Sequence, residues 1–100
     1  MATLQKLMFR GAASTSNTLL YTVPSATEAI VTNIIVSSSS ESEQDFSITL
    51  DGFPIASNTP INSNDVIAFD IRQVLADGDE ISAYASSTDI TFHISGVEVG

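Results

Sequence analysis

The chain has 100 residues, enough for one domain with a single core, and 43% of them are hydrophobic, which excludes wholesale disorder. The formal net charge is −9, from 12 acidic and 3 basic residues, and this argues against nucleic acid as a partner because phosphate contacts need Lys and Arg. With no Cys and one His, disulfides, thiolate metal sites and most catalytic constellations are excluded.

The N-terminal segment lacks the uninterrupted apolar stretch of a signal peptide, because Lys6 and Arg10 fall among its apolar residues. The longest apolar run, residues 34–36, is far shorter than the roughly 20 residues of a transmembrane helix. We therefore expect neither a leader sequence nor a membrane partner.

Residues 1–17 are expected to form an N-terminal arm and linker, followed by a β-sandwich domain over residues 18–100. The arm carries apolar and basic side chains that are candidates for binding a partner: Leu4, Lys6, Leu7, Met8, Phe9 and Arg10. Residues 1–27 hold two basic residues and no acid, whereas all twelve acids follow. Two interpretations stay open: an extended arm that docks on a neighbouring subunit by strand addition, or an ordinary first strand of the sandwich.

Residues 18–23 predict a strand with Leu19, Tyr21 and Val23 on one side. The run over 28–38 is apolar on both faces and rich in β-branched residues, which indicates a central strand. Residues 37–44 (SSSSESEQ) then form an acidic low-complexity loop that is expected to be too polar to pack.

Residues 45–51 show strict alternation of apolar and polar side chains, the pattern of a half-buried strand. Asp51-Gly52 predicts a tight hairpin turn, with residues 53–56 as a short second strand. Pro54 lacks a backbone donor, so this second strand should lie at a sheet edge.

A loop over 62–65 precedes Ile67, Phe69 and Ile71, which form an inward face. Residues 73–76 are the best candidate for a single helical turn. At the C-terminus, residues 81–86 and 90–95 alternate like the two strands of a hairpin. Gly96 inside the last strand predicts a bulge or a close backbone approach.

These segments predict an all-β fold, an antiparallel sandwich of seven or eight strands with jelly-roll or immunoglobulin-like topology. The alternating faces should share one core. Its expected members are Phe46, Ile48, Leu50, Ile67, Phe69, Phe92 and Ile94.

Candidate chemistry in the sequence is sparse. His93 alternates outward, and nothing in the pattern places a nucleophile and an orienting acid beside it. Residues 77–80 (DGDE) could offer oxygen ligands to Ca²⁺, but Asp and Gly at these positions are equally typical of a turn. We therefore expect no enzyme activity, no metal and no cofactor.

Three stretches carry a resemblance to a known group of proteins: LLYTVPSATEAIVTNIIV (19–36), VLADGDEISAYAS (74–86) and ISGVEV (94–99). Together they span most of the chain from residue 19 onward. The pattern resembles small β-sandwich structural proteins of tailed bacteriophages, which include capsid decoration (cement) proteins and modules of tail fibres and baseplates. The shared motifs are structural, so no catalytic residue is carried over.

The resemblance implies a non-enzymatic protein of the virion that binds the major capsid protein or another virion protein. The compact length favours a decoration protein on the capsid surface over a tail module. Decoration proteins often occupy three-fold positions, so the resemblance also implies a homo-oligomer, with a trimer as the expected state.

Two functions from other classes are kept beside this one. The chain could be a receptor- or carbohydrate-binding module of a tail fibre or baseplate, which would bind cells or glycans rather than capsids. It could also be a small hydrolase that uses paired carboxylates, but twelve acids allow many such pairs and make none of them specific.

Overall fold

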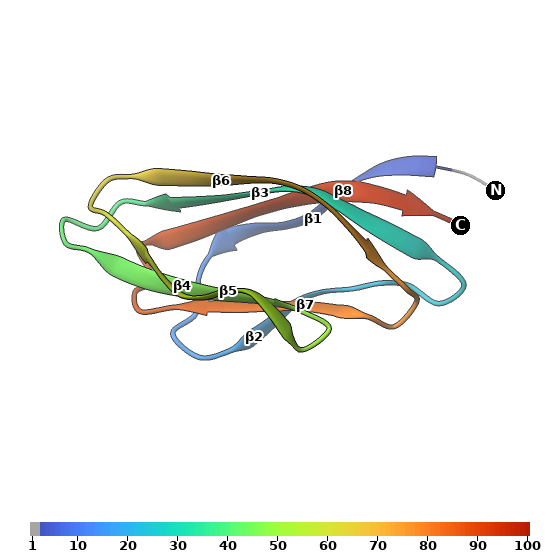
Figure 1. The fold of residues 1–100 in the computed structure, drawn as a ribbon, viewed down its shortest axis with the longest axis horizontal. Helices are drawn as coiled ribbons and strands as arrows, with labels where there is room; N and C mark the ends of the chain where they lie inside the picture. Colours follow the sequence, from blue (N-terminus) through green and yellow to red (C-terminus); the bar gives the residue numbers. More distant parts are fainter. Residues whose placement is uncertain (1–2) are drawn as a thin grey trace.

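The computed structural model describes residues 3–100, which form two stacked four-stranded antiparallel sheets (Figure 1). The eight strands are β1 (Thr3–Ala12), β2 (Thr18–Thr22), β3 (Glu28–Ser38), β4 (Gln44–Leu50), β5 (Phe53–Ile61), β6 (Val66–Leu75), β7 (Glu80–Ala85) and β8 (Ile90–Val99). The molecule is elongated, measuring 46 × 20 × 18 Å. No helix in the described part of the chain is long and apolar enough to span a membrane.

The strand order identifies the topology. The first sheet has the order β1-β8-β3-β6 and the second sheet β2-β7-β4-β5, so consecutive strands alternate between the sheets except in the β4–β5 hairpin. The first strand pairs with the last, as in a double Greek-key jelly roll of eight strands. The expected antiparallel sandwich is therefore confirmed, and the jelly-roll alternative is the correct one.

The β4–β5 hairpin forms as the alternation predicts. Asp51 and Gly52 have φ angles of 51° and 83°, the left-handed pair of a type I′ turn, whose twist matches that of the flanking strands. Strand β5 lies at the edge of the second sheet, where the missing donor of Pro54 breaks no ladder.

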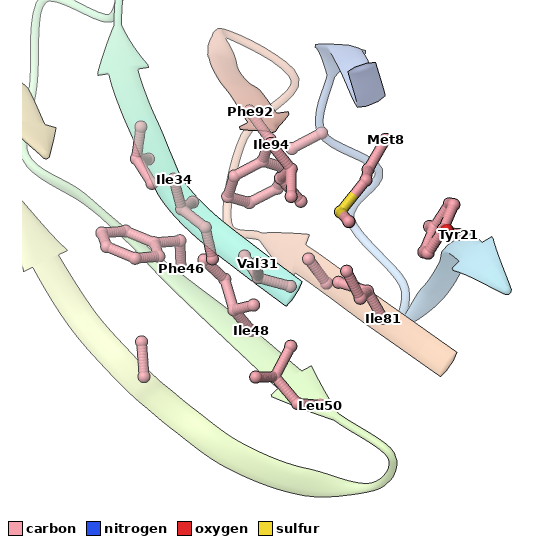
Figure 2. Packing of buried hydrophobic residues seen from close by; sticks show 14 of the residues in the cluster. Met8, Tyr21, Val31, Ile34, Phe46, Ile48, Leu50, Ile81, Phe92 and Ile94 are labelled. Atoms are coloured by element: carbon pink, nitrogen blue, oxygen red, sulfur yellow. The ribbon is translucent and has the colours of Figure 1, made fainter. Parts of the chain in front are cut away.

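The core lies between the two sheets and contains the seven expected residues in two grades of burial. Phe46, Ile48, Leu50, Phe92 and Ile94 are buried, while Ile67 and Phe69 are half-buried and pack against them. Figure 2 shows Phe46, Phe92 and Ile94 converging with Val31 and Ile34 between the layers. The expectation of one shared core is confirmed.

Gly96 allows a close approach of two backbones, as its place inside the last strand predicts. A Cβ at this position would lie 2.1 Å from the carbonyl oxygen of Ile30 and 2.6 Å from the side chain of Met8. Strands β1 and β3, which flank Gly96 on both sides, are each irregular here, with register shifts at Met8 and Thr32. The first sheet is thus dented at this point.

The N-terminal segment corrects one expectation. Residues 3–12 form β1, which pairs along its length with β8, so the described part of the segment is an edge strand of the first sheet and not a separate arm. The linker is also ordered: the Ala13 amide donates to Ile90 O at 2.7 Å, and Ser14 O accepts from Ala85 at 2.9 Å. Its small residues let the chain cross closely from one sheet to the other.

Two further expectations are wrong because strand pairing decides these positions. Residues 73–75 belong to β6 and pair with β3 instead of forming a helical turn, because strand pairing overrides weak local propensity. In β2, an extra residue between Leu19 and Tyr21 shifts the register, so Leu19 is exposed while Tyr21 and Val23 are buried.

The serine-rich segment after β3 packs despite its polarity. Ser38 and Ser40 are buried, and Ser38 Oγ accepts the Ser40 amide at 3.1 Å. Ser40 Oγ in turn accepts from the amide of Ser42 and the side chain of Gln44. Hydroxyl groups replace the missing backbone partners, which composition alone does not reveal.

Tyr21 joins the two sheets through its hydroxyl, which donates to the carboxylate of Glu98 on β8. Burial of the phenol is the main cause that raises the pKa of Tyr21 above its usual value, and the hydrogen bond to Glu98 and its negative charge add to the effect. The neutral phenol is therefore favoured in the folded protein.

We expect the stability to fall as pH rises above about 10, the usual pKa of an unfolded tyrosine. Above that pH the unfolded chain loses the Tyr21 proton while the folded protein retains it, so unfolding becomes more favourable. Tyr21→Phe should lower the unfolding free energy by about 1 kcal/mol at neutral pH and flatten this alkaline loss. Urea unfolding at pH 8–11 measures both; an unchanged alkaline loss in Tyr21→Phe would contradict the assignment.

Candidate functional site

The six candidate partner-binding residues all lie on β1, but the structure divides them. Leu4 and Leu7 are 61% and 49% exposed, and Lys6 and Arg10 are exposed as well. Met8 is only 6% exposed, and Phe9 is half-buried against the core. Met8 and Phe9 are therefore corrected to core positions, which leaves four residues available to a partner.

A β-bulge explains this division. Leu7 pairs with Ser95 and Phe9 pairs with Ile94, so Met8 is an extra residue in β1. The bulge changes which face later residues occupy, turning Phe9 inward beside Ile94 and Arg10 outward beside His93. As a result Leu7 and Arg10 point from the same outer face of the sheet.

The outer face of the first sheet, which we call the docking face, presents aliphatic and small polar side chains. Directly paired residues form three rows that each run across the sheet in the order β6, β3, β8, β1. The first row is Val74, Ile30, Val97 and Gln5, the second is Asp70, Asn33, Ser95 and Leu7, and the third is Ala68, Ile35, His93 and Arg10. Side chains in one row are close neighbours. The row that starts at Val74 is a continuous apolar strip over three strands.

Charge separates the two sheets. Lys6, Arg10 and Arg72, the three basic residues of the chain, all lie on strands of the first sheet. Three acids lie on the same strands: Glu28, Asp70 and Glu98. The first sheet is thus balanced in formal charge, and the net −9 of the protein comes from the second sheet and the loops. A charge-balanced face with exposed aliphatic side chains is suited to protein contact.

A groove of about 530 Å³ crosses the docking face at the dent around Gly96. Its lining includes Lys6, Leu7, Arg10, Thr32, Ser95 and Val97. The bulges in β1 and β3 interrupt the outer face at this point, whereas the position of Gly96 itself faces the core, where an added Cβ would meet Met8. Two of its lining residues are cations and two are aliphatic, and this composition favours a ligand that is both apolar and acidic.

His93 lies on the docking face between Arg10 and Ile35, its cross-strand neighbours. Neither neighbour supplies the carboxylate that orients a catalytic histidine. The position fits a contact residue better than a general base.

The carboxylates of the 77–80 segment act within the turn. Asp79 Oδ2 accepts the Ala76 amide at 2.9 Å, and Asp77 Oδ2 accepts the Ala26 amide at 3.3 Å. Gly78 has a φ of 80°, which the turn requires. Among residues 3–100, no group of three or more His, Asp or Glu side chains is placed to hold a metal ion.

Two surface features escaped the sequence analysis. Arg72 reaches the first sheet only through the pairing of β6 with β3, which no local pattern reveals. Phe53, directly after the Asp51-Gly52 turn, is 75% exposed. Its place at the end of a hairpin was a usable signal, because a side chain beside a tight turn often lies beyond the core.

Comparisons with known proteins assign no family. No family model and no curated protein matches the chain. Two crystal structures of a pentameric capsid protein isolated from metagenomic phage sequences are similar at 17% identity and a TM-score of 0.43, over 96% of this chain. The chain spans 59% and 60% of those two capsid chains. A carbohydrate-binding module, CBM35 from Paenibacillus barcinonensis, is similar at 10% identity and a TM-score of 0.37, over 98% of this chain and 88% of that one.

Proposed function

We propose that the chain is a non-enzymatic structural protein of a bacteriophage virion, a capsid decoration protein that stabilises the particle by binding across capsomers. The observation that carries this proposal is the docking face: a partly aliphatic surface on the one sheet whose strands are balanced in formal charge and hold every Lys and Arg of a protein with net charge −9. The resemblance of residues 19–99 to tailed-phage structural proteins supplies the virion context.

The proposed mechanism is mechanical. Apolar area buried across subunit boundaries opposes their separation, so bound copies hold neighbouring capsomers together. Along the β1 edge, Leu7 and Arg10 project from the docking face, and Leu4 and Lys6 project from the opposite face of the same strand. The two leucines supply exposed aliphatic contacts, and the two cations steer the protein toward an acidic partner surface. The partner is the major capsid protein or another virion protein, and the protein acts as a homo-oligomer, a trimer on three-fold positions.

The test adds purified protein to undecorated particles. Binding should saturate at a fixed number of copies per capsomer and raise the resistance of the particles to heat. Added salt should slow association about tenfold or more, because exposed charges are screened. Lys6→Gln with Arg10→Gln should mimic high salt.

A matched control separates the effect of the docking face on binding from the effect of the net charge. Thr22→Glu with Ser57→Glu changes the net charge by the same amount at exposed positions of the second sheet, and this variant should bind particles like the wild type. Equal losses in both variants would show that net charge alone governs binding and would remove the role of the docking face.

The alternative function is a receptor- or carbohydrate-binding module of a tail fibre or baseplate. The exposed ring of Phe53 favours it, since aromatic side chains stack on ligands. Saturable binding to host cells or glycans, without affinity for capsids, would replace the decoration proposal with this one.

A further inference from the structure

The β4–β5 turn presents an aromatic side chain on a rigid support. Phe53 is the most exposed of the large hydrophobic residues in the described chain, at 75%. It follows the type I′ turn Asp51-Gly52, whose backbone is fixed by strand pairing on both sides. We call Asp51, Gly52 and Phe53 the Phe53 tip. A large exposed ring on a rigid hairpin is suited to fill a pocket in a partner at little cost in conformational entropy.

The surroundings of the Phe53 tip are acidic. The Asp51 amide donates to the carbonyl of Glu80 at 2.6 Å, which brings the exposed side chains of both residues to the same end of the second sheet. The strands of that sheet, all within the described residues, contain no Lys or Arg. The pocket that takes this tip should therefore combine apolar walls with basic groups.

The groove around Gly96 has this composition. Leu7 and Val97 offer apolar contacts, and Lys6 and Arg10 are also among its lining residues, with Arg10 on the outer face. Its volume of about 530 Å³ is ample for a phenyl ring. The residues that line the groove belong to strands of the first sheet. The Phe53 tip belongs to the second sheet, which forms the other layer (Figure 1). One copy therefore cannot fill its own groove, so a Phe53 tip seated there would come from a second copy.

We propose that copies of this chain associate head to tail, with the Phe53 tip of one copy seated in the groove of the next. Head-to-tail association deepens the proposed function, because it names a second copy of the chain as the partner of one part of the docking face. It rests on the proposed function only in placing this association on a virion. The contact joins two different surfaces, so it is heterologous and generates either a closed ring or a filament. A ring of three copies agrees with the trimer expected for the protein.

The test measures self-association of the purified protein without particles, by sedimentation over a range of concentrations. Phe53→Ser removes the ring, and Lys6→Glu with Arg10→Glu reverses the charge of the groove. Each should weaken association about 30-fold or more, the effect of losing a central interface contact. Leu19→Ser is the matched control: Leu19 is 52% exposed on the opposite edge of the second sheet from β5, and its loss should change nothing.

Mixing the two variants gives the sharpest result. The Phe53→Ser copy retains an intact groove and the charge-reversed copy retains an intact tip, so an equal mixture should form one-to-one heterodimers and nothing larger. Absence of association in the mixture, or a monomeric wild type, overturns the inference. Phe53→Leu and Arg10→Gln provide milder replacements if a first variant does not fold.

The two proposals fail separately. A wild type that stays monomeric but binds particles would overturn head-to-tail association and leave the decoration function intact. A head-to-tail oligomer without affinity for particles would do the reverse.

Discussion

Replacing Phe92 with alanine is expected to destabilise the protein by about 3–5 kcal/mol, the usual cost of truncating a fully buried phenylalanine. Phe92 is completely buried and meets Phe46 edge to face, with ring centroids 6.2 Å apart. Alanine would lose this contact and leave a cavity between the sheets. Because domains of this size are stable by only about 5–15 kcal/mol, the variant would lose a large share of its stability.

Two matched substitutions calibrate this effect in urea or thermal unfolding. Phe53→Ala removes the same side chain from an exposed site and should cost less than about 0.5 kcal/mol. Phe69→Ala should fall between, since Phe69 also meets Phe46 at 6.2 Å but is half-buried. A loss below about 1 kcal/mol for Phe92→Ala would mean that its strand face is exposed and the register is shifted by one.

Gly96→Ala is the second large effect, with an expected cost of about 3 kcal/mol, at the upper end for inserting one methyl group into a packed region. The added Cβ would meet the carbonyl oxygen of Ile30 at 2.1 Å. That neighbour is backbone of β3, so the two central strands of the first sheet, β8 and β3, would have to separate.

Gly11→Ala is the matched control in the same sheet. Its Cβ would meet only the ring of Phe9, at 3.3 Å, and a half-buried side chain can move aside. Thermal unfolding should therefore rank Gly96→Ala well below Gly11→Ala in stability. Equal stability of the two variants would show that β8 and β3 leave room for a Cβ at position 96, contrary to the 2.1 Å contact with Ile30 O.

The sequence predicts those parts of the fold that local chemistry determines. Alternation over 45–51 and the Asp51-Gly52 turn specify a hairpin without reference to the rest of the chain. Pro54 places that hairpin at a sheet edge. Gly96 indicates a close approach of two backbones, because any larger residue would place a side chain between them. Each of these signals acts within a few residues.

Bulges are the main reason why other predictions fail. An extra residue in one strand reverses the facing of all residues beyond it, and nothing in the composition of β1 or β2 announces one. Phe9 therefore turns inward beside Ile94 although Leu7, two residues earlier, remains outside, and Leu19 leaves the face of Tyr21. Sheet pairing decides these positions, and pairing involves residues far apart in the chain.

The candidate site likewise combines features that the local sequence predicts with features that depend on strand pairing. Lys6 and Arg10 stand out in the sequence as basic residues in an acidic chain, and the structure leaves both exposed. The groove beside them could not be predicted, because it needs Thr32 and Val97 from two other strands. The balance of charge on the first sheet likewise depends on which strands share a sheet.

The central claim is that the docking face holds the protein on the virion, and a cryo-EM map of the phage particle that carries this protein tests it most directly. We expect jelly-roll density at fixed, symmetry-related positions between capsomers, with the outer face of the β1-β8-β3-β6 sheet buried against neighbouring subunits. The second sheet, which together with the loops carries the net negative charge, should be exposed to solvent except at its Phe53 tip. Density at the tail instead of the capsid, or a capsid-bound copy whose docking face is open to solvent, would contradict the account.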